Sequence, residues 1–491
     1  MSQSHWSERY EPVIGLEIHV QLSTRTKMFC GCELSFGDEP NVHTCPVCLA
    51  HPGALPVVNE TAIEYGIKIG LALGCEISPR SIFHRKNYFY PDSPKAYQIS
   101  QYDIPLAANG RLGDVRIHRC HLEEDAAKSM HVGGSGRIHG SGASLVDFNR
   151  GGTPLVEIVT EPDLHSAADV REWAQLLRTT VKSLGVSDVN MEEGSLRCDA
   201  NISLRPVGSD TLGTKTELKN MNSFRFIERG IEAEIARQAA ILDAGGTIEQ
   251  ETLHFDPKTG TLTPLRSKEE AHDYRYFPEP DLVPMVPSTE LLNRVRESLP
   301  ELPVARRQRY LDELDLGEEF ATQLGFDADL GDFFERTLGN APDAAPKLVA
   351  TWFAGELLPR LRANADSETE TAELLASSKV DPVRLGGLVA MVDGKQVTTA
   401  AARQVLDTMV ESGEEAAVIV EREGLAQIDA GGGELDAIID AAIASDPDAA
   451  AKVREGNMGA IGPLVGYVMR ETKGRVDGGE VNRLLREKLS G

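Results

Sequence analysis

One alternating stretch near the N-terminus, Val13-Ile14-Gly15-Leu16-Glu17-Ile18-His19-Val20-Gln21-Leu22, decides how this chain begins to fold. Successive side chains of a strand point to opposite faces, so the stretch has one apolar face and one polar face that carries Glu17, His19 and Gln21. A carboxylate and an imidazole two residues apart on one face can hold a divalent cation. The alternative is a half-buried strand whose polar face is simply wetted.

The length and composition are those of a folded protein with several domains. A chain of 491 residues exceeds what one hydrophobic core supports, and 41% hydrophobic with 26% charged residues is ordinary. No run approaches the ~20 apolar residues that cross a membrane, and the N-terminus lacks an apolar signal core, so we expect a cytoplasmic protein with no membrane partner. The net charge of −26 argues against nonspecific binding to polyanions, although a local basic surface can still bind nucleic acid.

The residue pattern changes character near position 290. Before it, short alternating segments and Gly/Pro turns surround two helical patterns, Ser166–Leu184 and Arg225–Ala244, and four prolines keep Phe277–Pro287 extended as a closing strap. After it, helical spacing predicts Leu291–Leu299, Val304–Leu314, Gly317–Leu324, Pro346–Ala363, Asp381–Val392, Thr398–Ser412 and Glu480–Leu489. We therefore predict an α+β domain with a mainly antiparallel sheet, residues 1–290, followed by two small all-α domains, residues 291–408 and 409–491.

Four of the cysteines form two close pairs, Cys30 with Cys32 and Cys45 with Cys48, separated by a turn-rich loop. Two such pairs can surround one tetrahedral Zn²⁺, and a reducing compartment excludes the disulfide interpretation. We predict a structural zinc-ribbon loop, because four thiolates leave no open position for catalysis. Cys75, Cys120 and Cys198 lie in apolar runs and are expected to be buried thiols.

Acidic residues recur in two further places. The segment His121-Leu122-Glu123-Glu124-Asp125 follows a strand pattern, and three adjacent acids by themselves predict a solvent-facing turn. In Pro154–Val159, by contrast, Glu157 lies in a strand that is apolar on both faces. A buried carboxylate without a partner is costly, so Glu157 requires a cation or a proton.

Two other segments have the composition of a ligand site. In the strand pattern of Ser195–Arg205, one face carries Arg197, Asp199 and Asn201, which resembles a ligand floor more than a wetted surface. The segment from Arg85 to Gln101 combines Lys86 and Lys95 with tyrosines, which can bind phosphates and stack on a base or ribose. The alternative for this segment is an aromatic-packed surface loop. No Walker A or dinucleotide motif is present.

Several long motifs, taken in order, resemble the GatB/GatE family, the B subunits of tRNA-dependent Asp/Glu amidotransferases (the GatCAB complex). They are Val13–His19, Arg85–Asp92, His121–Asp125, Asp147–Arg150 with Pro154–Glu157, and Lys219–Phe224. Near the C-terminus, Asn457–Met469 resembles the YqeY-like tail of that family. The resemblance covers essentially the whole chain and implies a cradle-like catalytic domain.

The resemblance implies an enzyme, a carbon–nitrogen ligase that uses glutamine as amide donor. The side-chain carboxylate of misacylated Glu-tRNA(Gln) or Asp-tRNA(Asn) would attack ATP, with Mg²⁺, to give an acyl phosphate. Ammonia from a separate amidase subunit (A) would then displace phosphate, and a small subunit (C) would complete a heterotrimer. Which of the two charged tRNAs is used is left open by the sequence.

The resemblance also implies site residues. Glu17, His19, Glu123, Glu124 and Glu157 resemble metal ligands, with Glu17, His19, Glu124 and Glu157 as catalytic residues; strand parity does not choose between Glu123 and Glu124. Lys86, Arg150, Asp199 and Asn201 are candidates for contacts with ATP.

One departure from the family and two rival functions remain. A Gly-rich segment, residues 131–142, adds a hairpin that is more typical of a tolerated insertion than of a lid. One rival function is a stand-alone ATP-dependent ligase for a free amino acid, which would not need the helical appendages. The other is a noncatalytic zinc-bearing scaffold that docks tRNA and an amidase.

Overall fold

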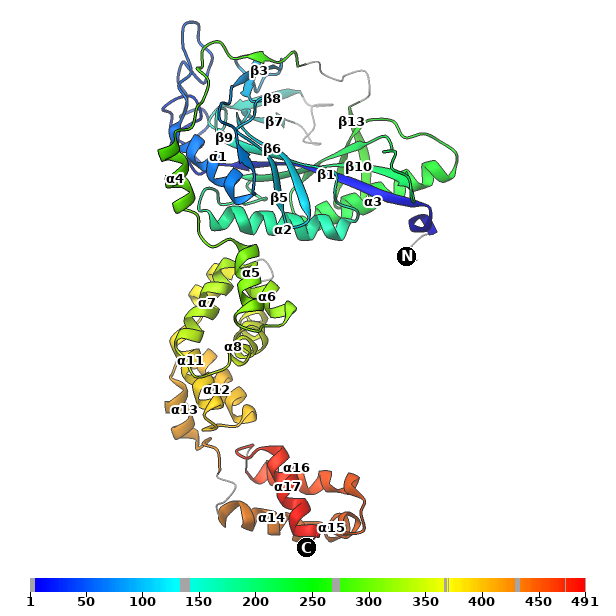
Figure 1. The fold of residues 1–491 in the computed structure, drawn as a ribbon, viewed down its shortest axis with the longest axis vertical. Helices are drawn as coiled ribbons and strands as arrows, with labels where there is room; N and C mark the ends of the chain where they lie inside the picture. The colour runs from blue at the N-terminus through cyan, green and yellow to red at the C-terminus, as the bar shows by residue number, and fades with distance from the viewer. Residues whose placement is uncertain are drawn as a thin grey trace. The chain divides into compact units, whose positions relative to one another are not determined.

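The alternating stretch that begins at Val13 forms most of β1, the central strand of a nine-stranded sheet in the computed structural model (Figure 1). The structure describes residues 5–132, 142–266, 274–365, 369, 371–428, 433–472 and 474–490. It divides into two compact units, residues 1–302 and 303–491. Most of the Gly-rich insertion, residues 133–141, lies outside the described residues, as does Lys473.

The first unit is an α+β structure. Its large sheet has the strand order β13-β12-β11-β10-β1-β9-β6-β5-β2, and every neighbouring pair is antiparallel except β11 with β12. The strands are β1 Tyr10–Gln21, β2 Glu76–Ile77, β5 Ala107–Leu112, β6 Val115–Glu124, β9 Pro154–Thr160, β10 Leu196–Pro206, β11 Thr216–Met221, β12 Thr252–Asp256 and β13 Thr261–Arg266. Two small sheets, β14-β3-β4 and β7-β8, comprise β3 His84–Asn87, β4 Tyr97–Ser100, β7 Lys128–Val132, β8 Ala143–Asp147 and β14 Phe277–Pro278.

The two faces of the large sheet differ in what covers them. Helices α2 and α3 lie along one face, whereas β3, β7 and β8 lie on the opposite side (Figure 1). Ile14, Leu16, Ile18 and Val20 of β1 are at most 1% exposed, so the apolar face predicted from the alternation forms the core under these helices. The helices of this unit are η1 His5–Glu8, α1 Glu60–Ala72, α2 Ala167–Ser183, α3 Phe224–Asp243 and α4 Thr289–Glu297.

Local chemistry explains where the helices of this unit begin. The Ser166 side chain caps α2 by accepting from the amide of Asp169, and the Ser223 side chain caps α3 by accepting from the amide of Phe226. The extended strap is also confirmed: Glu279 is buried under a bidentate ion pair with Arg85, and Met285 bridges to Ser81.

One prediction for this unit is wrong. The acidic segment ending at Asp125 is not a solvent-facing turn, because β6 continues through Glu124 and buries Glu123, Glu124 and Asp125. Their partners come from other parts of the chain: His19 for Glu123, Lys95 for Glu124 and Arg197 for Asp125. Three acids in a row do not reveal such partners. In the segment from Arg85 to Gln101, β3 pairs with β4, so the alternative interpretation of this segment as a surface loop does not describe it.

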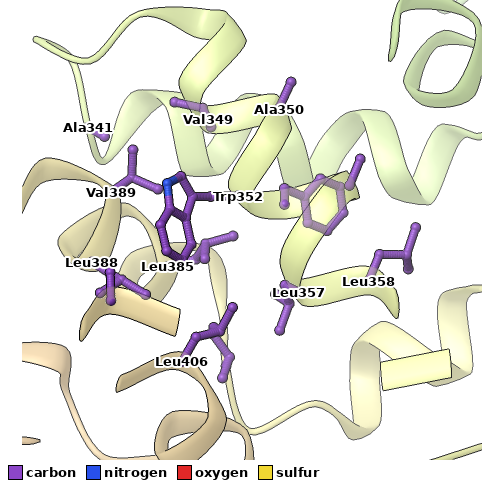
Figure 2. Packing of buried hydrophobic residues seen from close by; sticks show 14 of the residues in the cluster. Ala341, Val349, Ala350, Trp352, Leu357, Leu358, Leu385, Leu388, Val389 and Leu406 are labelled. Carbon is purple, nitrogen blue, oxygen red and sulfur yellow. The ribbon is translucent and has the colours of Figure 1, made fainter. Parts of the chain in front are cut away.

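The described residues of the second unit form helices and their connections, with no strand. It contains α5 Pro303–Asp312, α6 Glu318–Gly325, α7 Ala328–Gly339, α8 Pro346–Ala350, η3 Thr351–Leu357, α9 Leu358–Ala363, α10 Thr371–Ser377, α11 Pro382–Asp393, α12 Thr399–Ser412, α13 Ala416–Glu423, α14 Gly433–Ser445, α15 Pro447–Arg454, η4 Met458–Ile461, α16 Gly462–Glu471 and α17 Gly478–Ser490. Figure 2 shows Trp352 of η3 packed among Leu385, Leu388 and Val389 of α11. A first buried cluster extends from Tyr310 to Leu425, and a second begins at Ile428.

The predicted single helix Pro346–Ala363 is interrupted. Residues Thr351–Leu357 form a π-helical segment between α8 and α9. Pro359 has no amide N–H to continue the regular hydrogen-bond ladder, so a wider turn before it is a physically reasonable accommodation. Helix α7 was not predicted, although Asp327 caps it by accepting from the amides of Asp329 and Leu330.

Candidate functional site

A row of charged side chains crosses four strands on the polar face of the large sheet. The strand register places His121 of β6 opposite Glu157 of β9, Glu157 opposite His19 of β1, and His19 opposite Arg197 of β10. In the adjacent row, Glu17 lies opposite Asp199. Antiparallel pairing thus gathers onto one surface residues that are far apart in the sequence, as the partners His19 and Arg197 illustrate.

Three members of this region form a compact group of possible metal ligands. One ligand atom each from His19, Glu123 and Glu157 lies within 4.8 Å of the others. The Nε2 atom of His19 is 3.4 Å from Glu123 and 3.5 Å from Glu157, and Nε2 of His121 is 3.3 Å from Glu157. Two buried carboxylates and an imidazole nitrogen at this spacing fit a divalent cation.

The electrostatics of this group follow from its burial. Burial alone would lower the pKa of His19, but hydrogen bonds and charge from Glu123 and Glu157 outweigh it and raise that pKa to about 10. Burial alone would raise the pKa of Glu157, but His121 and His19 hold it well below its ordinary value. In the metal-free group, His19 and His121 are thus the partners that the buried carboxylate of Glu157 requires, and a bound cation would take their place.

A cavity of about 1610 Å³ lies over this face of the sheet. A smaller cavity of about 170 Å³ adjoins it, and His19, Lys86, Tyr88, Gln98 and Arg197 line both. Glu123, Glu124 and Asp125 face the smaller cavity, whereas Glu17, Glu157, Asp199 and Asn201 face the larger one. The row of charged residues therefore lies at the junction of the two.

The predicted residues outside the compact group have other partners. Asn201 donates a hydrogen bond to Glu17 over 3.1 Å, and Asp199 pairs with Lys219 over 2.7 Å. Glu124 pairs with Lys95 and accepts from the amide of Ile99. Glu17 and Glu124 thus lie outside the His19–Glu123–Glu157 group, and their assignment as metal ligands stays a prediction.

Of the cations predicted to contact phosphates, Lys86 lines both cavities and Lys95 lines the smaller one, whereas Arg150 lines neither. The Nζ atom of Lys86 lies 4.8 Å from the ring centroid of Tyr274, and Glu123 and Glu157 help raise its pKa against the effect of burial. Arg150 donates to the carbonyls of Ala126 and Ala127, which holds the end of the acidic segment in place. Its assignment as a phosphate contact stays a prediction.

Other residues at the cavity were not singled out from the sequence. Arg119 lies two positions before His121 and within 3.7 Å of Glu157. Tyr102 and Tyr276 stack with ring centroids 4.5 Å apart at the wall of the larger cavity. Strand parity with His121 was a usable signal for Arg119. Nothing local identified Tyr276, because it lies just before the strap and far from the other cavity residues in the sequence.

The four predicted zinc ligands lie together. The Sγ atoms of Cys30, Cys32, Cys45 and Cys48 are all within 4.8 Å of one another, and the Cys32–Cys48 and Cys45–Cys48 separations are 4.0 and 3.9 Å. Zn–S bonds of about 2.3 Å in a tetrahedron imply sulfur separations of about 3.8 Å. The cluster therefore fits a zinc site. Cys75, Cys120 and Cys198 are buried, as predicted.

The cysteine loop is attached to the turn that precedes β9. The amide of His43 donates to Asn149, the fully buried Lys27 donates to the carbonyl of Phe148, and the amide of Met28 donates to the carbonyl of Gly152. Gly152 has φ of +90° and lies against the Lys27 side chain, with Cys48 nearby, where a Cβ would have little room. The loop consequently fixes the wall of the smaller cavity.

Among the described residues, no helix is long and apolar enough to cross a membrane.

Comparison with known proteins matches nearly the whole chain to one family. The family model described as the GatB/GatE catalytic domain matches residues 12–293, and the one described as the GatB domain matches residues 332–489. Three curated relatives are named as the B subunit of aspartyl/glutamyl-tRNA(Asn/Gln) amidotransferase. That of Persephonella marina is 47% identical (98% of this chain, 99% of the relative), that of Moorella thermoacetica 48% (98% and 100%), and that of Thermobifida fusca 48% (98% and 94%). Since both the catalytic domain and nearly the full length match, this chain belongs to the GatB/GatE family.

Proposed function

We propose that this chain is the component of a tRNA-dependent amidotransferase that activates the side-chain carboxylate of misacylated Glu-tRNA(Gln) or Asp-tRNA(Asn) and converts it to the amide. The charged row from His121 to Arg197 carries the proposal, because it places ionised carboxylates and cations on the floor of a large cavity. Full-length similarity to relatives named as the B subunit of such an enzyme supports it. Since charged tRNA is made and used in the cytoplasm, we place the protein there.

The reaction brings two anions, a carboxylate and a nucleotide phosphate, into contact. A carboxylate oxygen forms a bond to the γ-phosphorus of ATP while the bond from that phosphorus to the β–γ bridging oxygen breaks, and ADP leaves with the electron pair. Ammonia then attacks the activated carbonyl carbon, the C–N bond forms, phosphate leaves, and nitrogen loses a proton to solvent. Cations that screen the repulsion in the first step provide most of the catalysis.

The chain's own residues divide this work. His19, Glu123 and Glu157 would hold Mg²⁺, with Glu17 and Glu124 as further candidates. When bound, Mg²⁺ supplies positive charge to the phosphate oxygens. Lys86, which lines both cavities, would contact a phosphate of ATP. Asp199 and Asn201, which line the larger cavity beside Glu17, would make further contacts with ATP.

The helical unit and the cysteine loop would serve binding and architecture. We assign charged-tRNA recognition to the helical domains, for which the sequence predicts a division at residue 408. The division of buried clusters favours a boundary between Leu425 and Ile428 instead, since residue 408 lies inside α12. An amidase subunit would deliver ammonia and a small subunit would complete the assembly. The four cysteines would hold a structural zinc.

ATP consumption in the presence of different acceptors tests this function. Purified protein with its co-purifying subunits should form ADP when Glu-tRNA(Gln) or Asp-tRNA(Asn) is added, and not with free glutamate or correctly charged Gln-tRNA(Gln). Comparing the two misacylated tRNAs identifies the substrate. ADP formation with free glutamate would instead favour a stand-alone ligase, and no ADP with any acceptor would favour a noncatalytic scaffold.

A further inference from the structure

Two arginines at the cavity each bury an Nε–H group that has no acceptor. They are Arg119 of β6 and Arg197 of β10, and among the described residues neither Nε atom has a hydrogen-bond partner. A buried donor on a charged group is costly to leave unpaired, so each position calls for an acceptor that the described chain does not supply.

Three other arginines of this unit behave differently. The Nε atoms of Arg85, Arg116 and Arg205 donate to carboxylates, over 2.7 Å to Glu279, 2.9 Å to Asp163 and 2.8 Å to Glu11. In these structural ion pairs, a carboxylate accepts the Nε–H of the guanidinium group. The two cavity arginines contact carboxylates only through a terminal nitrogen, Arg197 at Asp125 and Arg119 at Glu157, so among the described residues their Nε–H groups stay without an acceptor.

The two guanidinium groups also flank the compact ligand group. Arg119 lies 3.7 Å from Glu157, and Arg197 is anchored by Asp125 over 3.0 Å, two positions beyond Glu123 on the same segment. Arg197 lines both cavities and Arg119 lines the larger one. Guanidinium groups placed around a carboxylate and imidazole group match a tetrahedral oxyanion, which accepts several hydrogen bonds at once.

We propose that Arg119 and Arg197 form an oxyanion clamp that binds the phosphoryl group while it passes from the nucleotide to the tRNA-borne carboxylate. This inference rests on the proposed function. The guanidinium groups stay protonated throughout: they donate hydrogen bonds to the non-bridging oxygens as the new O–P bond forms and the β–γ bond breaks. Asp125 is a positioning residue, because it acts only by holding Arg197.

Binding of radiolabelled ADP with and without aluminium fluoride, a mimic of the phosphoryl group in transfer, tests the clamp in the full chain with magnesium present. Wild-type protein should bind ADP more tightly when aluminium fluoride is added. Arg119→Lys and Arg197→Lys keep the charge but lose the Nε–H and the planar fork. Both variants should bind ADP alone like wild type, but most of the increase in ADP affinity on addition of aluminium fluoride should be lost. The kcat should fall on the order of 10²-fold, with a nearly unchanged KM for ATP.

The matched control is Arg116→Lys, on the same strand as Arg119 but exposed and paired with Asp163, and it should keep the full gain. If the cavity variants gain as much as wild type, the clamp is wrong while the proposed function stands. If wild type itself gains nothing, the phosphoryl-transfer function fails at this site and the clamp fails with it. If a Lys variant loses ADP binding through misfolding, Asp125→Asn is measured in its place, because it leaves both guanidinium groups intact. The clamp then requires a smaller increase in ADP affinity with aluminium fluoride than in wild type, and a full increase would overturn it.

Discussion

At the scale of single residues, the chemistry depends most directly on the carboxylate of Glu157. It contacts His19 and His121 and belongs to the compact ligand group. Glu157→Gln keeps the volume and removes the charge that a cation requires. We expect tRNA-dependent ADP formation to fall by orders of magnitude, while the fold and tRNA binding stay largely intact.

The matched control for this change is Glu161→Gln. Glu161 follows the same strand, β9, but pairs with the exposed His118 and does not line either cavity. It should keep wild-type ADP formation. Wild-type ATP consumption in Glu157→Gln itself would place Glu157 outside the catalytic group.

Part of this site could be predicted from local pattern. Alternation in one strand is enough to place Glu17 with His19 and to show that Glu157 is buried, because parity and burial are local properties. That Glu123 lies within reach of His19 and Glu157, and that Arg119 lies beside Glu157, depends instead on how the strands pair. Pairing between segments far apart in the chain is not encoded in either segment alone.

At the scale of elements, the cysteine loop is the part whose stability should depend on a metal. Cys45→Ser removes one of four ligands, so we expect the zinc content, about one per chain in wild type, to fall strongly. Because this loop holds Phe148 and Gly152 in place, solubility and melting temperature should fall more than tRNA selectivity changes. Elemental analysis with thermal melting checks both; folded, reduced wild-type protein without zinc would contradict the assignment.

In the helical unit, Glu356 of η3 links the interrupted helix to α12. It accepts hydrogen bonds from Arg360 over 2.9 Å and Arg403 over 2.8 Å. Burial alone would raise the pKa of Glu356, but these hydrogen bonds outweigh it and lower the pKa. Because the folded-state pKa is depressed, the stabilisation is present above the ordinary glutamate pKa, about 4.3, and is lost as the pH falls through the folded value.

Urea unfolding of wild type and Glu356→Gln at several pH values measures this link. Near pH 7 the variant should be less stable on the order of 1 kcal/mol, and the difference should shrink below about pH 4. Glu421→Gln, on α13 in the same unit, is a control that should show no such trend. A difference between wild type and Glu356→Gln that is constant with pH would mean that the charge of Glu356 does not stabilise the unit.

The helices show which features of secondary structure the sequence pattern predicts and which it does not. Caps such as Ser166 and Ser223 are local, and the two helices that they begin were predicted. The π-helical segment at Thr351–Leu357 was not, because apolar spacing does not distinguish a regular turn from a wider one. Helix α7 was missed as well, although its Asp327 cap was visible in the sequence.

At the scale of the whole molecule, we expect the first unit to carry the chemistry and the helical unit to carry most of the tRNA recognition. Helix α4 belongs to the first unit, where Arg294 pairs with Glu64, so the chain should be cut after Leu302 rather than at residue 290, the predicted end of the first domain. The fragment 1–302 keeps every candidate site residue and should bind ATP weakly, whereas its affinity for charged tRNA should be strongly reduced. Filter binding measures both ligands, and unchanged tRNA affinity would move recognition onto the first unit.

Within the tail, the segment from Arg470 to Lys488 has a local excess of cations, six Lys/Arg against four Asp/Glu, in a chain that is acidic as a whole. Neutralising Arg475 together with Lys473 should weaken tRNA binding mildly and reduce its salt dependence. Neutralising Arg483, which pairs with Glu480 and Glu487, is the comparison and should change the salt dependence less. Equal effects of the two changes would argue against a contact centred on Arg475.

The central claim is that the carboxylate carried by tRNA is phosphorylated before it is amidated, and isotope transfer tests this most directly. Misacylated tRNA whose glutamyl side-chain carboxylate is labelled with ¹⁸O is incubated with the full assembly, ATP and glutamine, and the released phosphate is analysed by mass. An acyl phosphate transfers one carboxylate oxygen to phosphate, so the phosphate should carry one ¹⁸O for each amide formed, and Glu157→Gln should abolish both products. Amide formation with unlabelled phosphate would contradict the account.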